Sequence, residues 1–384
     1  MRLANSARMR RLIAFVIALA CCALPAGART PVPIGTFPPG AVDGITDVAG
    51  VRVAHVTKVE GTSVRTGATG IIANDDTWNQ RVAAATYVLN GNGEMTGAHW
   101  VDQSGFLEVP VVLTNTLNVG RVDDGVVSWL IGKHPQIGVR EDVPLPVVAE
   151  CDDQGINDIQ GRHVYAEDVV AMLDAAKPGD FLRGNVGAGT GMRAFGFAAG
   201  IGSASRVLPA QLGGYTVGVL VNANTGSRGE LRIDGVPVGR ALVNELLPIY
   251  PRSAGYAPPD HGRAADGSVI IVVATDAPLD HTRLRDVAKR ASMGLARTGA
   301  TSHVSSGDLF IAFSTTHRYP RAGGITGPPL ESDEDRIDAL FAATVEATES
   351  AIDDALFSAH DVSGRAGVKY FALPRERVLT LLKR

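Results

Sequence analysis

The strands that this sequence predicts are largely apolar on both faces, and this feature restricts the fold more than any other. Runs rich in β-branched residues occur at 50–57 (GVRVAHVT), 66–73 (TGATGIIA) and 109–116 (VPVVLTNT), and another, SVIIVVAT, starts at Ser268. Many of these runs lack the alternation of a half-exposed strand. A strand that is apolar on both faces lies in a sheet covered on both sides, by helices or by a second sheet. The sequence therefore predicts a layered α/β protein.

Helices are predicted between these strands. The segments are Asp123–Lys133, Val164–Ala176, Gly239–Leu247, Leu279–Arg297 and Asp335–Phe357. In the last two, apolar residues recur at spacings of three and four and leave a charged face, which indicates amphipathic helices. A chain of 384 residues that is 45% hydrophobic can bury a large core, as one large domain or two ordinary ones. Residues 249–266 combine Pro, Gly, Ser and charge without periodicity, which predicts a loop.

The N-terminus has the pattern of a secretory signal peptide. Several arginines precede an apolar run of 13 residues, Leu12–Leu24, and small residues follow as Ala26-Gly27-Ala28. A membrane span needs about 20 residues, so a retained anchor is the less favoured interpretation. We expect cleavage after Ala28 and a periplasmic protein. The residues before Cys21 match a lipoprotein site only loosely.

Charge and cysteine content narrow the possible partners. The whole chain has a net charge of -4, and without residues 1–28 it has 32 basic against 40 acidic residues, a net charge of -8. An acidic chain without a basic cluster argues against binding nucleic acid or an anionic membrane. Cys151 is the only cysteine beyond residue 28, so the exported chain can form no internal disulfide.

Common catalytic and cofactor motifs are absent from the sequence. The nine histidines never fall at metal-ligand spacing, no GxSxG occurs, and we expect neither a metal nor another cofactor. The glycine-rich stretch 185–206 has neither the GxGxxG that opens a helix nor a terminal GK[ST]. Turns and close backbone packing are the favoured interpretation, although its N–H groups could line an active site.

One junction, Asp266-Gly267-Ser268, is compatible with chemistry on the chain itself. If the Ser268 hydroxyl attacks the Gly267 carbonyl, the peptide shifts from nitrogen to oxygen, and water then frees Ser268 as a new N-terminus. Gly at the preceding position suits such a shift, because it lacks a Cβ. The freed α-amine, with a pKa of about 7.7 to 8.0, can then accept the proton of the Ser268 hydroxyl. From these residues alone, a turn before a buried strand is the favoured interpretation.

A resemblance to a known family supports the chemical interpretation. The stretches DGSVIIVVATDAPL (266–279) and GDLFIAFST (307–315) resemble the self-cleaving aminopeptidase family typified by DmpA, the L-aminopeptidase/D-esterase, and by the bacterial β-peptidyl aminopeptidases. Other blocks similar to this family follow in family order and cover most of the chain after residue 28. They are 45–57, 91–97, 107–120, 147–158 and 186–206.

The resemblance implies how the chain is processed and which groups surround the nucleophile. Residues 29–384 would form a single catalytic domain, cut between Gly267 and Ser268 into an α-chain of residues 29–267 and a β-chain of residues 268–384. Ser268 would be the N-terminal nucleophile. Ser306 and Asp308 match a serine and an acidic residue that lie close to it in the family. Asp308 is one methylene shorter than the Glu of some relatives. The alternative for this pair is a turn whose side chains cap backbone N–H groups.

Two more residues receive roles from the resemblance. Asn224, in VLVNANTG, matches an Asn whose amide helps to hold the oxyanion. Asn222 points to the same side if this segment is a strand, and family members usually carry Gln there. Glu150 matches an acidic residue that meets the free amino group of the substrate in the β-aminopeptidase branch. A structural Glu that pairs with an Arg is its alternative.

The resemblance also implies a fold, an assembly and an activity. The expected fold is a four-layer α/β/β/α sandwich similar to the N-terminal-nucleophile hydrolases, with different connectivity, and the expected assembly is a homo-oligomer of four αβ units. We expect a serine aminopeptidase that removes the N-terminal residue from short peptides, amides or esters through an acyl-enzyme at Ser268. The alternatives are an acyltransferase similar to the ornithine acetyltransferases, which use Thr at the cleaved junction, and a non-catalytic periplasmic binding protein.

Overall fold

The computed structural model describes residues 30–251, 267–330 and 333–383. The predicted signal peptide, with Cys21 and its cleavage site after Ala28, lies outside the described residues. So does most of the predicted loop 249–266, including Asp266. None of the helices in the described ranges is both long and apolar enough to span a bilayer.

The larger of the two main sheets has six strands. Their order across the sheet is β4-β3-β12-β11-β10-β9. The strands are β3 (Gln80–Gly91), β4 (Phe106–Leu107), β9 (Ile201–Val207), β10 (Thr216–Asn224), β11 (Ser268–Thr275) and β12 (Gly307–Pro320). Strand β11 is central, antiparallel to β10 on one side and parallel to β12 on the other. Its first residue is Ser268, as the sequence predicts.

The second main sheet has four strands, in the order β1-β2-β5-β6. They are β1 (Arg52–Glu60), β2 (Val64–Ile72), β5 (Val111–Asn115) and β6 (Val147–Cys151). The pair β5 and β6 is parallel, and the helix between them supplies the crossover. Two small hairpins accompany these sheets. One pairs β7 (Arg193–Ala194) with β8 (Phe197–Ala198), and the other pairs β13 (Val362–Ser363) with β14 (Lys369–Tyr370).

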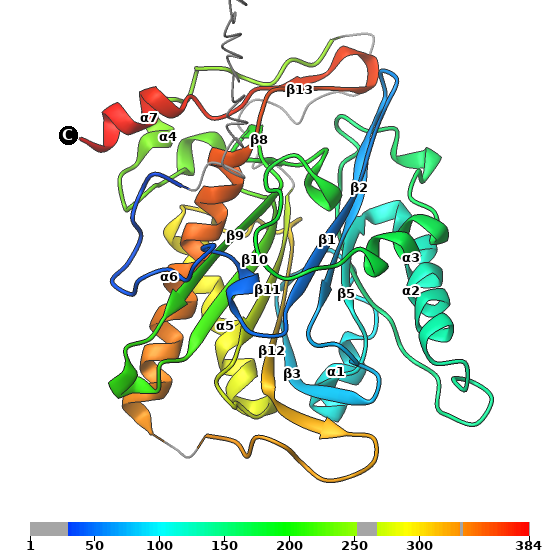
Figure 1. The fold of residues 1–384 in the computed structure, drawn as a ribbon. Coiled ribbons are helices and arrows are strands. Elements are labelled where there is room, and N and C mark those ends of the chain that lie inside the picture. The colour runs from blue at the N-terminus through cyan, green and yellow to red at the C-terminus, as the bar shows by residue number, and fades with distance from the viewer. Residues whose placement is uncertain (1–29, 252–266, 331–332, 384) are drawn as a thin grey trace, which may run out of the picture.

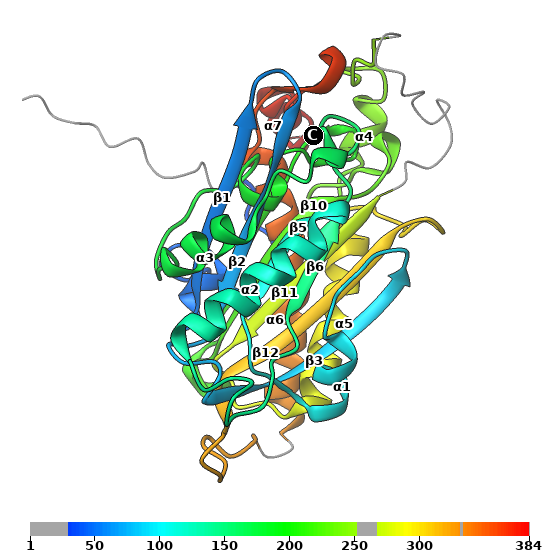
Figure 2. The same ribbon diagram turned by 90° about the vertical axis from the view of Figure 1, so that its right-hand side faces the viewer.

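The two sheets lie face to face between two layers of helices (Figure 1). Helices α5 (His281–Arg297) and α6 (Glu334–Ser358) cover the outer face of the six-stranded sheet, and α2 (Val119–Lys133) and α3 (Ala166–Asp174) cover the four-stranded sheet. The view in Figure 2 shows α2 in front of the strands that it covers. Three short helices, α1 (Ala98–Ser104), α4 (Val238–Ala241) and α7 (Arg375–Leu382), lie at the periphery. The expected α/β/β/α sandwich is confirmed.

Strand β11 shows why its sequence does not alternate. Val269, Ile271 and Val273 are buried in the core shared with α5 and α6. The intervening Ile270, Val272 and Ala274 are equally buried in the core shared with the four-stranded sheet. Both faces of the strand are therefore covered, and apolar residues are favoured at every position.

Four of the five predicted helices form close to their predicted bounds, and the fifth is mostly wrong. The segment Gly239–Leu247 is helical only as far as Ala241, in α4. The Arg228 side chain donates hydrogen bonds to the carbonyls of Leu242 and Glu245, and Leu246 has a φ of 49°. The carbonyls that would continue the helix thus accept hydrogen bonds from the Arg228 side chain instead.

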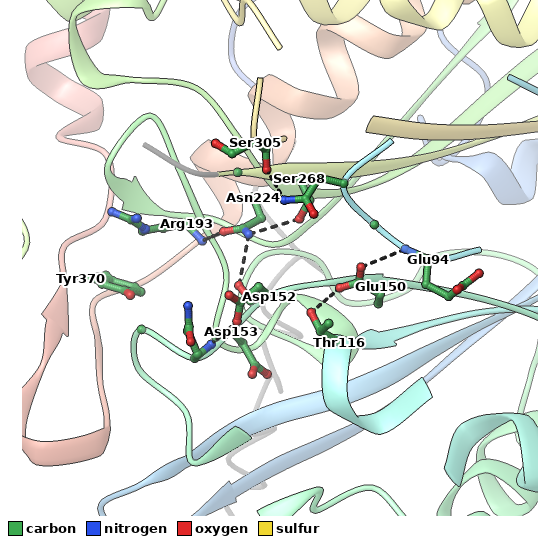
Figure 3. A pocket seen from close by; sticks show the side chains of 16 residues that line it. Glu94, Thr116, Glu150, Asp152, Asp153, Arg193, Asn224, Ser268, Ser305 and Tyr370 are labelled. Atoms are coloured by element: carbon green, nitrogen blue, oxygen red, sulfur yellow. Dashed lines mark hydrogen bonds between the residues drawn. The ribbon is translucent and has the colours of Figure 1, made fainter. Parts of the chain in front are cut away.

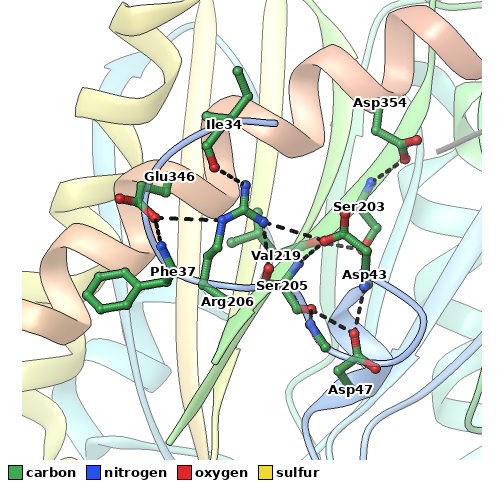
Figure 4. A network of polar contacts seen from close by, with 12 residues as sticks. Ile34, Phe37, Asp43, Asp47, Ser203, Ser205, Arg206, Val219, Glu346 and Asp354 are labelled. Atoms are coloured by element: carbon green, nitrogen blue, oxygen red, sulfur yellow. Dashed lines mark hydrogen bonds and ion pairs between the residues drawn. The ribbon is translucent and has the colours of Figure 1, made fainter. Parts of the chain in front are cut away.

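Helix α6 differs from its prediction in one respect, because its charged face is buried. Glu346 accepts hydrogen bonds from the backbone N–H groups of Thr36 and Phe37 and lies 3.7 Å from the Arg206 guanidinium (Figure 4). Asp354 accepts one from the Ser203 N–H. The segment that precedes β1 and the side chains of β9 therefore cover a face that was predicted to contact solvent.

Candidate active site

Ser268 lies where three strands meet. It opens β11 and is paired with Asn224, the last residue of β10, and with Gly307, the first residue of β12. Gly267 precedes it in continuous chain, and the Gly267 carbonyl accepts a hydrogen bond from the Gly307 N–H at 3.2 Å. A Cβ on Gly267 would lie 2.8 Å from the Asn224 carbonyl oxygen, which is too close for any other residue. Glycine is thus required here by close packing, not by a positive φ.

Asn224 is the amide that reaches the Ser268 hydroxyl. Its Nδ2 lies 3.4 Å from the Ser268 Oγ and donates to the Asp152 carbonyl at 3.1 Å, and its Oδ1 accepts from the Arg193 N–H at 3.4 Å (Figure 3). Asn222 shares this face of β10 but is completely buried, and its side-chain amide has no hydrogen-bond partner among the described residues. The structure therefore brings Asn224, and not Asn222, to Ser268.

Glu150, the penultimate residue of β6, faces Ser268 from the opposite sheet. Its side chain is only 4% exposed. Oε1 accepts the Glu94 N–H at 3.0 Å, and Oε2 accepts a short hydrogen bond from the Thr116 hydroxyl. Burial raises the pKa of the Glu150 carboxyl, with these two hydrogen bonds opposing the shift. No Arg or Lys of the described segments forms an ion pair with Glu150. The alternative considered from the sequence, a structural Glu that pairs with an Arg, is therefore not what the structure shows.

Ser306 and Asp308 lie beside Ser268 but behind the cavity wall. The Ser306 hydroxyl donates to the Asp308 Oδ1 at 2.6 Å, and both side chains are buried. The other oxygen of Asp308 has no hydrogen-bond partner in the described part of the chain. Burial raises the pKa of the Asp308 carboxyl, and hydrogen bonds from Ser306 and Ser302 oppose this. The cavity itself is lined by Ser305, the neighbour of Ser306.

These groups surround a cavity of about 540 Å³. Four of the side chains that line it are carboxylates and one is a cation. The lining residues are Asn92, Gly93, Glu94, Thr116, Glu150, Asp152, Asp153, Gln154, Gly155, Gly191, Arg193, Asn224, Gly267, Ser268, Ser305 and Tyr370. Such a lining attracts cations, and both Glu150 and Ser268 belong to it.

Sequence reasoning missed two buried groups at this site. Asp153 accepts hydrogen bonds from Thr66 at 2.6 Å and Asn157 at 2.9 Å, and burial raises its pKa to about 7. The Cys151 thiol donates to the Asn222 carbonyl at 3.6 Å, and burial raises its pKa well above the ordinary value. Both occur in the block 147–158 that carries the resemblance, but only the packing of β6 against β10 places them near Ser268.

The glycine-rich stretch 185–206 has a structural role and also supplies two of the residues that line the cavity. Gly189 and Gly200 pack backbone against backbone, since a Cβ on either would lie 2.4 Å from main-chain atoms. Gly191 and Arg193 line the cavity, as the sequence interpretation allowed. Within the described segments, no three His, Cys, Asp or Glu side chains are grouped so that they could hold a metal ion.

Comparisons with known proteins agree with this arrangement. The sequence pattern of peptidase family S58 matches residues 43–370. The β-peptidyl aminopeptidase BapA of Sphingosinicella xenopeptidilytica is 40% identical, over 97% of this chain and 95% of that protein.

Solved structures give the same result. A β-aminopeptidase of Burkholderia sp. superposes with a TM-score of 0.81 at 40% identity, over 93% of this chain and 98% of that one. The L-aminopeptidase D-Ala-esterase/amidase of Ochrobactrum anthropi superposes with a TM-score of 0.81 at 34% identity, over 91% of this chain and 96% of that one. That protein is a prototype for the serine aminopeptidases and has a variant of the Ntn-hydrolase fold. These similarities favour the aminopeptidase over the acyltransferase and the binding protein.

Proposed function

This chain belongs to peptidase family S58, whose members include self-processing serine aminopeptidases, and we propose that it acts on short β-peptides. Ser268 is the nucleophile in this proposal. The observation that carries this proposal is the position of Ser268. Its hydroxyl faces an acidic cavity, and its backbone nitrogen is bonded to Gly267, which no other residue can replace. One bond cleavage there would leave nucleophile and α-amine in the same residue.

Self-cleavage follows from the contacts of the intact junction. The Ser268 Oγ attacks the Gly267 carbonyl carbon and forms the C–O bond. The C–N bond then breaks, and the proton lost by the Ser268 hydroxyl ends on the Ser268 nitrogen, which becomes a free amine. The Gly307 N–H, which already donates to the Gly267 carbonyl, would stabilise the developing oxyanion. Water then hydrolyses the ester and gives chains of residues 29–267 and 268–384, which form one catalytic domain.

In turnover the same hydroxyl attacks the substrate carbonyl. The α-amine of Ser268 accepts the hydroxyl proton and passes it to the leaving amine, and the Asn224 amide donates to the oxyanion. Water then releases the acyl group. Ser306 and Asp308, placed beside Gly307 on the neighbouring strand, would hold the α-amine in its working orientation.

Glu150 would select substrates that begin with a free amine. A buried carboxylate gains most when an ammonium binds it, because its desolvation is otherwise not offset. In a β-residue one extra methylene separates the amine from the scissile carbonyl. The two β-peptide-cleaving relatives, each 40% identical to this chain, support that choice of substrate.

The test is the intact mass of the purified protein under denaturing conditions, with sequencing of every N-terminus. Two chains are expected, one of which begins Ser268-Val269-Ile270. Ser268→Ala should give one uncut chain without activity. Ser292→Ala, on α5 and remote from the cavity, is the matched control and should be cut normally. A wild-type protein that stays uncut yet folded would contradict the proposal.

Export and assembly are part of the same proposal. Residues 1–28 would direct the chain to the periplasm, where cleavage after Ala28 makes Arg29 the first residue of the α-chain. Four αβ units would then form the oligomer. N-terminal sequencing of the α-chain tests the first point, and light scattering of the purified protein tests the second.

A further inference from the structure

The acidic and basic side chains of the cavity are distributed unevenly around Ser268. In Figure 3, Glu150 and Glu94 lie to one side of Ser268 and Asn224, and Arg193 and Tyr370 lie to the other. Arg193 is the only cationic side chain among the described residues that line the cavity. Ser268 therefore lies between Glu150 on one side and Arg193 on the other, while in Figure 3 Asp152 and Asp153 lie below Asn224, between these two groups.

Arg193 is held on a short, well-anchored element. It opens strand β7 and is paired with Ala198 of β8, and its backbone N–H donates to the Asn224 Oδ1. Its Nη1 donates to the Tyr250 hydroxyl at 3.1 Å, and its guanidinium carbon lies 5.8 Å from the Tyr370 ring centre. The rings of Tyr250 and Tyr370 pack edge to face. These contacts orient the guanidinium at a fixed position relative to the oxyanion amide.

The direction of the substrate follows from Glu150. With the substrate ammonium at Glu150 and its first carbonyl at Ser268, the leaving part of the peptide extends away from Glu150, toward Arg193. In a dipeptide the leaving part is one amino acid, whose α-carboxylate follows within one residue. A cavity with four acidic side chains repels a substrate carboxylate unless a cation binds that carboxylate. A guanidinium can do so through two parallel hydrogen bonds.

We propose that Arg193 binds the C-terminal carboxylate of the substrate, so that the preferred substrates are very short peptides with a free C-terminus. This inference rests on the proposed function and specifies its substrate class. It assigns Arg193 to substrate binding on the leaving-group side, while Glu150 selects the amine. Esters and amides that lack a carboxylate are then hydrolysed without help from Arg193.

The test compares a β-dipeptide, β-homoalanyl-leucine, with its C-terminal amide on the processed enzyme. Arg193→Gln should lower kcat/KM for the free acid by about tenfold or more, mainly through KM, as expected for the loss of a charge-assisted hydrogen bond. The value for the amide should change by less than about twofold. Arg193→Lys should restore part of the preference for the acid. Arg285→Gln, on the exposed face of α5, is the matched control and should leave both values unchanged.

The outcomes separate this inference from the proposed function. An equal loss for acid and amide, or no loss for either, overturns the role of Arg193. The two-chain pattern of each variant on a denaturing gel shows whether Arg193→Gln has folded, because cleavage depends on the folded junction. If the wild-type enzyme hydrolyses neither β-peptide, the β-peptide proposal fails, and the ratio of acid to amide is then measured with L-alanyl-leucine and its amide.

Discussion

In the proposed function Glu150 selects the substrate amine, and its environment decides how that selection depends on pH. Glu150 is buried, and within the described part of the chain its carboxylate accepts hydrogen bonds only from a backbone N–H and a hydroxyl. Burial raises the pKa of this carboxyl. A carboxyl with a raised pKa begins to gain a proton at a higher pH than an ordinary Glu. Once protonated it no longer attracts an ammonium.

We therefore predict a steep acid limb in the pH profile of kcat/KM. Below about pH 8 the α-amine of Ser268 is protonated, and log kcat/KM should fall with a slope of one. Below the raised pKa of Glu150, which lies above its ordinary value of 4.5, the slope should become two. Glu150→Gln should lower kcat/KM about tenfold or more and remove this second step. Glu167→Gln, exposed on α3, should keep it, and a second step that persists without Glu150 would assign it to another group.

For the residues of the candidate site, the sequence predicted their types better than their contacts. Ser268, Asn224 and Glu150 are brought together as the resemblance implies, from three strands of two sheets. The sequence did not indicate that Ser306 and Asp308 lie behind the cavity wall, because one register step decides which face of β12 a side chain occupies. Arg193 had no motif of its own and emerges only from the position of β7.

Among the elements, α6 and β9 depend on a buried ionic contact. Arg206 on β9 is 3% exposed, lies 3.5 Å from Asp43 and 3.7 Å from Glu346, and donates to the Ile34 carbonyl at 2.7 Å (Figure 4). It joins the segment before β1 to the sheet and to α6. Removing one partner of a buried pair leaves the others without compensation.

Arg206→Ala should therefore lower the free energy of unfolding by about 3 to 5 kcal/mol, measured by urea denaturation. Arg283→Ala is the matched control, because Arg283 forms a half-exposed pair with Asp286 on α5. Its loss should change stability by about 1 kcal/mol or less. Similar effects of the two substitutions would show that the Arg206 contacts contribute little.

Periodicity predicted the elements well where packing is simple. The cap of α5 at Asp280, whose side chain accepts the Arg283 N–H, lies within one residue of the predicted start. Periodicity could not show that the acidic residues of α6 are buried, because their partners, Arg206 and the N–H groups of Thr36 and Phe37, lie far away in sequence. It also could not show that Arg228 ends α4 early.

In the whole molecule, the proposed cut divides a sheet in which two adjacent central strands come from one product and the strands on either side come from the other. Strands β11 and β12 belong to the product that begins at Ser268. They lie between β3 on one side and β10 on the other, and both of these strands precede Ser268. Helices α5 and α6, also from the second product, cover that sheet. Separation of the products would expose both edges of the β11–β12 pair and the face that packs against the four-stranded sheet.

We predict that the cut chains stay together without a covalent link. The single cysteine beyond residue 28 excludes a disulfide between them. Native mass spectrometry of the wild type should show α- and β-chains in equal number and no free chain, whereas denaturation should separate them. Refolding from separated chains should recover little activity unless both are present. A free β-chain under native conditions would contradict this prediction.

The meeting of β10, β11 and β12 at one point has a further consequence for biosynthesis. Gly267 packs against the Asn224 backbone, and its carbonyl accepts the Gly307 N–H, only when all three strands are in register. A chain that has not completed this sheet lacks those contacts and remains in one piece. The number of pieces then records the folding history of each molecule, and the fraction of uncut protein in a cell extract measures how many copies never reached the native state.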